Sequence, residues 1–211
     1  QSEDVKVYGH TDTEKHRYVG AQVSDDGKYL LISAAESTSG NRAYLKDLTK
    51  SDAQWITIKS ELEGDVYLLT SRDDDLYFVT NYQAPNSRVV LAKGDAPQTD
   101  NWVDIIPETE NVLTPNTAGE FIFAEYMIDA ISKVYQYNLQ GEQVREITLP
   151  GVGSSSGFGG KKDASKAYYS FSNYVTPTTI YEFDLASGES SLYKKPSVDF
   201  EPEQFVSEQV F

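Results

Sequence analysis

SDDGKYLLISAAESTSGNRAYLKDL, residues 24–48, decides the fold of this chain because its pattern returns three more times. A tight polar turn leads into an aromatic and aliphatic strand, and a polar loop then leads into a second strand. Counterparts begin at Ser71, Thr117 and Lys162, and the first strands recur at steps of 47, 45 and 46 residues when counted from Lys28. A period this steady, with β rather than helical patterning, is typical of blade repeats. The sequence therefore predicts a run of propeller blades.

The expected fold class is all-β, a β-propeller with about four consecutive four-stranded antiparallel blades. In the first blade, Asp25-Asp26-Gly27 supplies a strong hairpin turn between the strands YVGAQVS and KYLLISAA. Little helix is expected, because no long segment repeats its apolar residues with the helical period. The expected ranges are 1–10 for the outer strand of a preceding blade (VKVYG), 11–62, 63–109, 110–150 and 151–202 for the blades, and 203–211 for a strand-like tail.

The charge balance disfavours several classes of partner. The 211 residues include 33 acidic and 18 basic side chains, which gives a net charge of −15. Nucleic acid and acidic membrane surfaces are disfavoured, because binding to either needs clustered Lys and Arg. With no cysteine, the chain has no disulfide, thiolate metal site or cysteine nucleophile. No apolar run has the length of a membrane span and no signal peptide opens the chain. A soluble protein is expected, and both bacterial cytoplasm and periplasm stay open.

One segment matches a catalytic pattern by its letters alone. Residues 153–157, GSSSG, fit the G-x-S-x-G turn of serine hydrolases, which needs a strand before it, a helix after it, and an acid and a histidine downstream. The glycine-rich GFGGKK that follows cannot open a helix, and His10 and His16 both lie upstream. The same glycines do not form a phosphate loop, so Lys161 and Lys162 are expected at the surface. We interpret the segment as an inner strand whose glycines let backbones approach closely.

Metal and cofactor sites are not expected. The acidic turns at 24–27 and 72–75 lack the ligand spacing of a calcium loop, and Asp-rich turns are common for local backbone hydrogen bonding alone. His10 and His16 lack the further ligands that zinc needs, and are expected in exposed loops. Because no nucleophile, base and oxyanion site are found together, the chain is not a catalyst on its own residues.

Several segments resemble the β-propeller domain of the prolyl oligopeptidase (prolyl endopeptidase) family, end to end and in order. They are QSEDVKVYG near the start and residues 20–33 (GAQVSDDGKYLLIS), 80–91 (TNYQAPNSRVVL) and 153–185. The resemblance implies the last four blades of a seven-bladed ring inserted in an α/β-hydrolase chain. The tail FEPEQFVSEQVF is similar to the family's crossing into the peptidase domain, whose Ser-Asp-His triad would follow residue 211. The implied role is steric gating, and the implied partners are the hydrolase domain and short proline-containing peptides.

The resemblance also implies a substrate-gating loop, since TNYQAPNSR is similar to a family pattern T-N-x-x-S-P-N-x-R. Its candidate residues are Asn81, Tyr82, Pro85, Asn86 and Arg88. An alanine replaces the usual serine of the pattern, and many members have a basic residue in place of the tyrosine. The Pro-Asn pair also forms an ordinary turn.

Two other functional hypotheses stay open at this stage. The chain could be a stand-alone propeller scaffold that binds a peptide or protein on its face. In the other hypothesis, two copies associate to close one ring.

Overall fold

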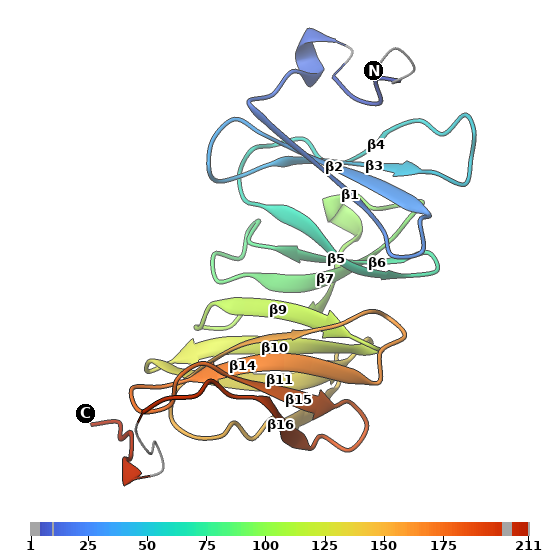
Figure 1. Cartoon of the computed structure of the whole chain (residues 1–211). Helices are drawn as coiled ribbons and strands as arrows, with labels where there is room; N and C mark the ends of the chain where they lie inside the picture. The colour runs from blue at the N-terminus through green and yellow to red at the C-terminus, as the bar shows by residue number, and fades with distance from the viewer. Residues whose placement is uncertain (1–4, 10, 200–203, 211) are drawn as a thin grey trace. The chain divides into compact units, whose positions relative to one another are not determined.

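The computed structural model describes residues 5–9, 11–199 and 204–210 of the chain (Figure 1). Within these residues, strands β1 to β16 form four four-stranded antiparallel sheets, each built from four consecutive strands in chain order. The helices are two short 3-10 turns, η1 (Asp12–Glu14) and η2 (Thr99–Asn101). The predictions of four consecutive four-stranded blades and of little helix are therefore confirmed.

The first two sheets follow the repeated pattern closely. The first consists of β1 (Tyr18–Val23), β2 (Tyr29–Ala35), β3 (Arg42–Asp47) and β4 (Ile56–Lys59). The second consists of β5 (Val66–Arg72), β6 (Asp75–Thr80), β7 (Arg88–Lys93) and β8 (Val103–Ile106). β1 and β2 pair from Tyr18↔Ala35 to Val23↔Leu30. The predicted turn joins them, with Gly27 at φ +74° donating its N–H to the Ser24 carbonyl at 2.8 Å.

The other two sheets have the same plan. The third consists of β9 (Leu113–Ala118), β10 (Phe121–Ile128), β11 (Ile131–Asn138) and β12 (Gln143–Glu146). The fourth consists of β13 (Ser154–Gly159), β14 (Lys166–Ser172), β15 (Thr179–Asp184) and β16 (Ser190–Lys194). The predicted ranges 11–62, 63–109, 110–150 and 151–202 each hold the strands of one sheet, while the placement of their boundaries stays a prediction.

The chain divides into two compact units, Gln1–Gln83 with Leu91–Val103, and Ala84–Val90 with Asp104–Phe211. In the first unit, β2 and β3 both contact β5. Asn41 is fully buried there: its side chain donates to the Val66 carbonyl at 2.9 Å and to the Ser33 hydroxyl at 2.7 Å, and it accepts the Val66 N–H at 2.9 Å. One polar side chain thus completes the backbone hydrogen bonds between two neighbouring sheets.

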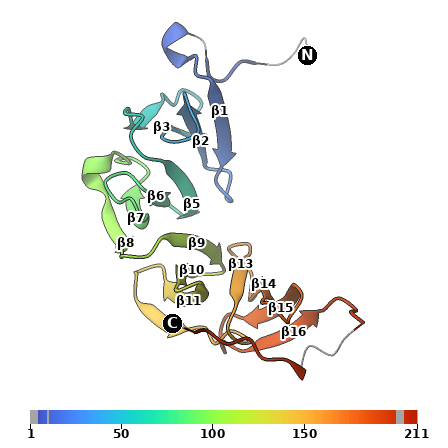
Figure 2. The ribbon, with the colours of Figure 1, turned by 90° about the vertical axis from the view of Figure 1, so that its left-hand side faces the viewer.

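In the second unit, β13 packs beside β9 and β10 (Figure 2). Buried aromatic rings fill the space between the third and fourth sheets, with Phe158 stacked on Tyr169 at 4.4 Å and on Phe123 at 5.2 Å between ring centroids. Phe158 has φ +61° at a register shift of the β13–β14 pair, so it is the extra residue of a β-bulge. The bulge turns this ring into the core.

The two ends of the chain differ from expectation. Residues 5–9 form irregular backbone instead of the predicted strand, and Tyr8 packs against Tyr44 and Trp55 at centroid distances of 5.7 and 5.8 Å. Residues 205–210 are irregular too, and the junction at 203 lies outside the described residues. A strand needs a neighbour for its backbone hydrogen bonds, and neither segment pairs with a strand among the described residues.

Candidate functional site

The predicted gating loop joins β6 to β7, and its first half is tied to the β4–β5 connection within the first unit. The Asn81 side-chain oxygen accepts the Asp65 N–H at 2.5 Å. The Thr80 hydroxyl donates to the Asp65 carbonyl at 2.7 Å and accepts the Tyr82 N–H at 3.0 Å. Asn81 therefore fixes the backbone of the β4–β5 connection, and its side-chain oxygen already accepts a hydrogen bond from it.

Tyr82 is only partly buried, and aromatic and cationic groups surround its ring. Trp102 lies edge-on to it, with 6.4 Å between ring centroids and 89° between ring planes. The Lys59 Nζ lies 5.3 Å from the Tyr82 ring centroid. The Trp102 indole N–H donates to the Pro97 carbonyl at 3.0 Å, which fixes its ring in turn. Tyr82 thus presents an oriented aromatic surface.

The second half of the loop lies in the second unit and has an equally fixed backbone. The Asn86 side chain donates to the carbonyls of Thr109 and Glu110 at 3.0 and 3.1 Å, and its backbone N–H donates to the Glu108 carboxylate at 2.6 Å. Arg88 pairs with Asp104 at 3.0 Å. Asn86 and Arg88 therefore anchor the loop.

Two further positions in this half differ in exposure. Pro85, one of the residues predicted for the gating loop, is exposed to solvent. Ala84, in the place of the family's serine, is buried. A hydroxyl there would need a hydrogen-bond partner in the interior.

The G-x-S-x-G segment forms a strand, as predicted, and this strand is the first of the fourth sheet. Residues 154–159 form β13, and the next element is the strand β14, not a helix. A Cβ on Gly153 would lie 2.5 Å from the Ser172 carbonyl oxygen, so the backbones do approach closely there. The Ser155 hydroxyl donates to the Glu125 carboxylate at 2.8 Å. Ser155 is therefore paired with an acid, whereas the serine of a G-x-S-x-G hydrolase is paired with a histidine base.

Glu125 is a buried carboxyl, 9% exposed, that sequence reasoning missed. Its Oε1 accepts hydrogen bonds from Ser132 at 3.0 Å and Ser155 at 2.8 Å. Burial raises the pKa of Glu125 above its ordinary value, and the two serine hydroxyls oppose that rise. The alternation of FIFAEYM placed Glu125 on the same strand face as the buried Phe123, which was the available signal.

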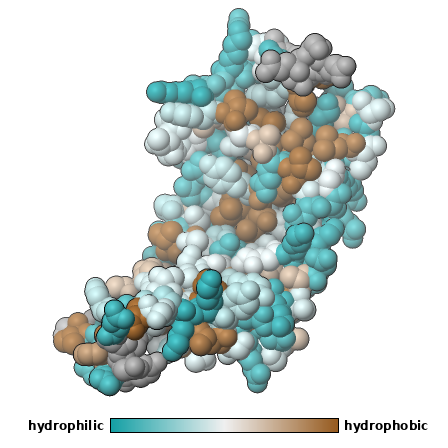
Figure 3. Space-filling model, in the orientation of Figure 1, coloured by the Kyte–Doolittle hydropathy of each residue, from teal (hydrophilic) through white to brown (hydrophobic). Residues whose placement is uncertain are grey.

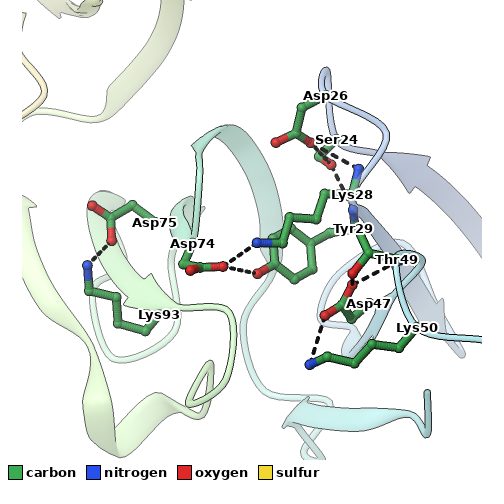
Figure 4. A network of polar contacts seen from close by, with 10 residues as sticks. All are labelled: Ser24, Asp26, Lys28, Tyr29, Asp47, Thr49, Lys50, Asp74, Asp75 and Lys93. Carbon is green, nitrogen blue, oxygen red and sulfur yellow. Dashed lines mark hydrogen bonds and ion pairs between the residues drawn. The ribbon is translucent and has the colours of Figure 1, made fainter. Parts of the chain in front are cut away.

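The acidic turns make ion pairs and hydrogen bonds inside the first unit (Figure 4). The Asp74 carboxylate contacts both the Lys28 ammonium and the Tyr29 hydroxyl, the latter at 3.0 Å. These contacts lower the pKa of Asp74, first through Lys28 and then through Tyr29. Asp75 pairs with Lys93. Among the described residues, no group of three or more His, Asp or Glu side chains is placed to hold a metal ion.

His16 lies in a loop, as predicted, but the prediction that it is exposed was wrong, while His10 lies outside the described residues. The His16 side chain is 2% exposed, and its Nδ1 lies 2.8 Å from the Glu36 carboxylate. Arg42 approaches the same nitrogen at 3.5 Å. Sequence spacing gave no sign of these partners: Glu36 lies in the β2–β3 connection and Arg42 is the first residue of β3. Lys161 and Lys162 are exposed, as predicted.

Each unit has a hollow that described residues line. One of about 580 Å³ lies against β14–β16, with Phe171, Tyr181 and Leu192 in its wall, and the described residues that line it include no acid and no histidine. The other, of about 670 Å³, lies against β1. Val19 and Val23 of that strand are exposed, and Figure 3 shows apolar side chains at the surface there. No helix among the described residues is long and apolar enough to cross a membrane.

Comparison with known proteins agrees with the four-sheet architecture. The family model described as the prolyl oligopeptidase N-terminal β-propeller domain matches residues 1–196. A prolyl endopeptidase of Elizabethkingia meningoseptica is 46% identical over all 211 residues, which cover 30% of that protein. A dual function macrocyclase-peptidase of Galerina marginata is 29% identical over the whole chain and again 30% of its own length.

Solved structures show the same fold. Prolyl oligopeptidase B from Galerina marginata superposes with a TM-score of 0.83 at 26% identity, covering 96% of this chain and 30% of that one. A structure from a study of two prolyl endopeptidases gives a TM-score of 0.81 at 31% identity over 89% of this chain and 28% of that one. The sheets are therefore propeller blades. The chain spans about 30% of the length of the curated relatives it matches.

Proposed function

The chain belongs to the prolyl oligopeptidase N-terminal β-propeller family, and on that basis we propose that it is the propeller of a longer prolyl endopeptidase. In this proposal a hydrolase domain outside the 211 residues cleaves short peptides after proline by serine chemistry. The propeller is a partner of that domain and limits the size of the peptides that reach it. The observation that carries the proposal is the 46% identity to a prolyl endopeptidase over every residue of the chain.

The side-chain contacts of the described residues support placing catalysis in another part of the protein. Ser155, in the segment that matches a hydrolase pattern, donates to a buried carboxylate and lies in a strand. The described histidine, His16, is engaged with Glu36 in the first unit. A nucleophilic serine needs a base within hydrogen-bond reach and an oxyanion site beside it. The described residues assemble no such set, so catalysis is assigned to the rest of the protein.

The proposed gating loop keeps the residues predicted for it but divides them by role. Asn81, Asn86 and Arg88 fix the loop through hydrogen bonds and an ion pair. Tyr82 and Pro85 are the positions with surface to offer a passing peptide. A fixed backbone suits a filter, because an ordered loop presents the same opening to every substrate.

The test is hydrolysis of a short chromogenic peptide ending in proline. The complete protein is expected to cleave it, whereas the 211-residue chain is expected to release no product. Ser155→Ala in the complete protein is the control, and it should leave turnover unchanged. Turnover by the isolated chain that disappears on Ser155→Ala would contradict the proposal, as would an inactive complete protein.

A further inference from the structure

Lys59, at the end of β4, is a buried lysine without a carboxylate partner among the described residues. Its residue surface is 2% exposed. The Nζ donates to the backbone carbonyls of Glu61 at 2.5 Å and Glu63 at 2.8 Å. A buried charge is costly unless hydrogen bonds or a counter-charge compensate it. A methionine of similar length would avoid the charge but would leave the carbonyls of Glu61 and Glu63 without this donor. The ammonium therefore ties the β4–β5 connection to the end of β4.

A β-bulge puts the side chain in this position. Thr57 pairs with Tyr44 and Lys59 with Ala43, so the register shifts by one residue between them. The shift breaks the alternation of the strand and buries both Ile58 and Lys59. The side chain therefore points under the β4–β5 connection. Burial lowers the pKa of the Lys59 amine, while the nearby acidic side chains of this connection, first that of Glu61, act against the lowering.

The third group around the ammonium is the Tyr82 ring, 5.3 Å away at its centroid. The backbones of Gly64 and Tyr82 approach closely, since a Cβ on Gly64 would lie 2.6 Å from the Tyr82 Cα. Trp102 meets the same ring edge-on. A cation beside the ring and an aromatic edge on another side of it together fix its orientation.

We propose that Lys59 is a positioning residue that holds the Tyr82 ring, next to Trp102, as an aromatic contact for proline-containing peptides. Proline-rich segments dock on aromatic surfaces because they are preorganised and present flat apolar rings. Tyr82 and Trp102 are both partly exposed and their orientation is fixed, as such a surface requires. The proposal rests on the proposed function and adds to it a specific contact.

The kinetic test uses the complete protein with Tyr82→Ala, Lys59→Met and the double substitution. Tyr82→Ala is expected to raise KM by about five- to tenfold with kcat nearly unchanged, the effect of losing roughly 1 kcal/mol of uniform binding. The increase should be larger for a longer peptide than for a short one. The double variant should be no worse than Tyr82→Ala, because Lys59 acts through that ring. Additive effects, or a wild-type KM in Tyr82→Ala, would overturn the proposal.

Two controls separate positioning from folding. Lys46→Met removes a lysine that lies 5.7 Å from the Trp55 ring centroid in the same sheet, away from the loop, and should leave KM as in the wild type. Tyr82→Phe keeps the ring and should also behave as the wild type. If Lys59→Met does not fold, the pair Tyr82→Ala and Tyr82→Phe still decides whether the ring is a contact.

A binding measurement distinguishes this inference from the proposed function. The 211 residues contain two tryptophans, so the difference in fluorescence between the complete protein and its Trp102→Phe variant isolates the signal of Trp102 beside the loop. A proline-containing peptide is expected to change that fluorescence, and Tyr82→Ala to weaken the response about five- to tenfold. An inactive complete protein that still shows the response would count against the peptidase and in favour of the contact. No response from an active protein would refute the contact alone.

Discussion

Replacing Glu125 by glutamine is expected to remove one pH-dependent contribution to the stability of the second unit. Glu125 is buried in β10, and Ser132 and Ser155 donate to its Oε1 at 3.0 and 2.8 Å. Its pKa is raised by burial, with only the two serine hydrogen bonds opposing and no cation contributing. Glutamine keeps a side-chain oxygen for the serines but has no charge to desolvate.

The sign follows from proton binding. Because the folded-state pKa of Glu125 is above the unfolded one, the folded state holds more protons between the two values. The contribution to stability is complete below about pH 4.5 and is lost as the pH rises through the folded pKa. The slope for one proton is at most about 1.4 kcal/mol per pH unit.

The magnitudes of two substitutions separate the charge from the hydrogen bonds. Glu125→Gln is expected to lower the free energy of unfolding at neutral pH by less than about 1 kcal/mol or to raise it, because a hydrogen-bonding group of the same shape remains. Glu125→Ala leaves two buried hydroxyls without an acceptor, about 1–3 kcal/mol each. We therefore expect it to destabilise the unit by about 3–5 kcal/mol once the cavity is included.

The assay is urea unfolding followed by far-ultraviolet circular dichroism, from about pH 4.5 to about pH 8. Wild type minus Glu125→Gln isolates the Glu125 titration, and the difference should favour the wild type at the acid end. Glu146→Gln is a matched control, since Glu146 lies in the same sheet, is half exposed and pairs with Lys133. Identical pH profiles for the wild type and Glu125→Gln would refute the reasoning.

Three further substitutions test the packing between sheets. Phe158→Ala should cost about 3–5 kcal/mol in urea unfolding and Phe158→Leu less than half of that, because the ring is fully buried among other aromatics; equal costs would argue against a packed ring. Asn41→Ala leaves the N–H and C=O of Val66 unpaired, and should lower stability by about 2–4 kcal/mol, whereas a loss below about 1 kcal/mol would mean that water replaces the amide. Asp74→Asn removes the ion pair with Lys28 and should weaken the dependence of the melting temperature on salt; an unchanged salt dependence would show that the pair contributes nothing.

Much of the fold could be predicted because local chemistry repeats in it. The turn at Asp25-Asp26-Gly27 needs a positive φ that only the glycine supplies easily, and the alternating strands around it follow from the pleat. The bulge at Phe158 could not be predicted. An aromatic residue rarely adopts φ +61°, and it does so here because stacking with Tyr169 and Phe123 in the core outweighs the backbone preference. The residues at 5–9 look like a strand but form none, since pairing depends on a neighbour.

The sequence likewise predicts some residues of the candidate site and not others. The pattern of the segment predicts Tyr82 and Pro85 in a loop and Asn86 in a turn, and the structure has them there. Lys59 was missed because the alternation of ITIK assigns it to the same strand face as the exposed Thr57, and only the bulge buries it. The pairing of Ser155 with Glu125 could not be predicted either, because Glu125 lies 30 residues away in the sequence and the contact forms between two sheets.

The most direct test of the propeller as a size filter compares one cleavage sequence in two settings. A short proline-containing peptide and the same sequence displayed in a loop of a folded protein are given to the complete protein, and product is followed by mass spectrometry. Cleavage of the peptide with the folded protein left intact is the expected result. Cleavage of both at similar rates would contradict the filter.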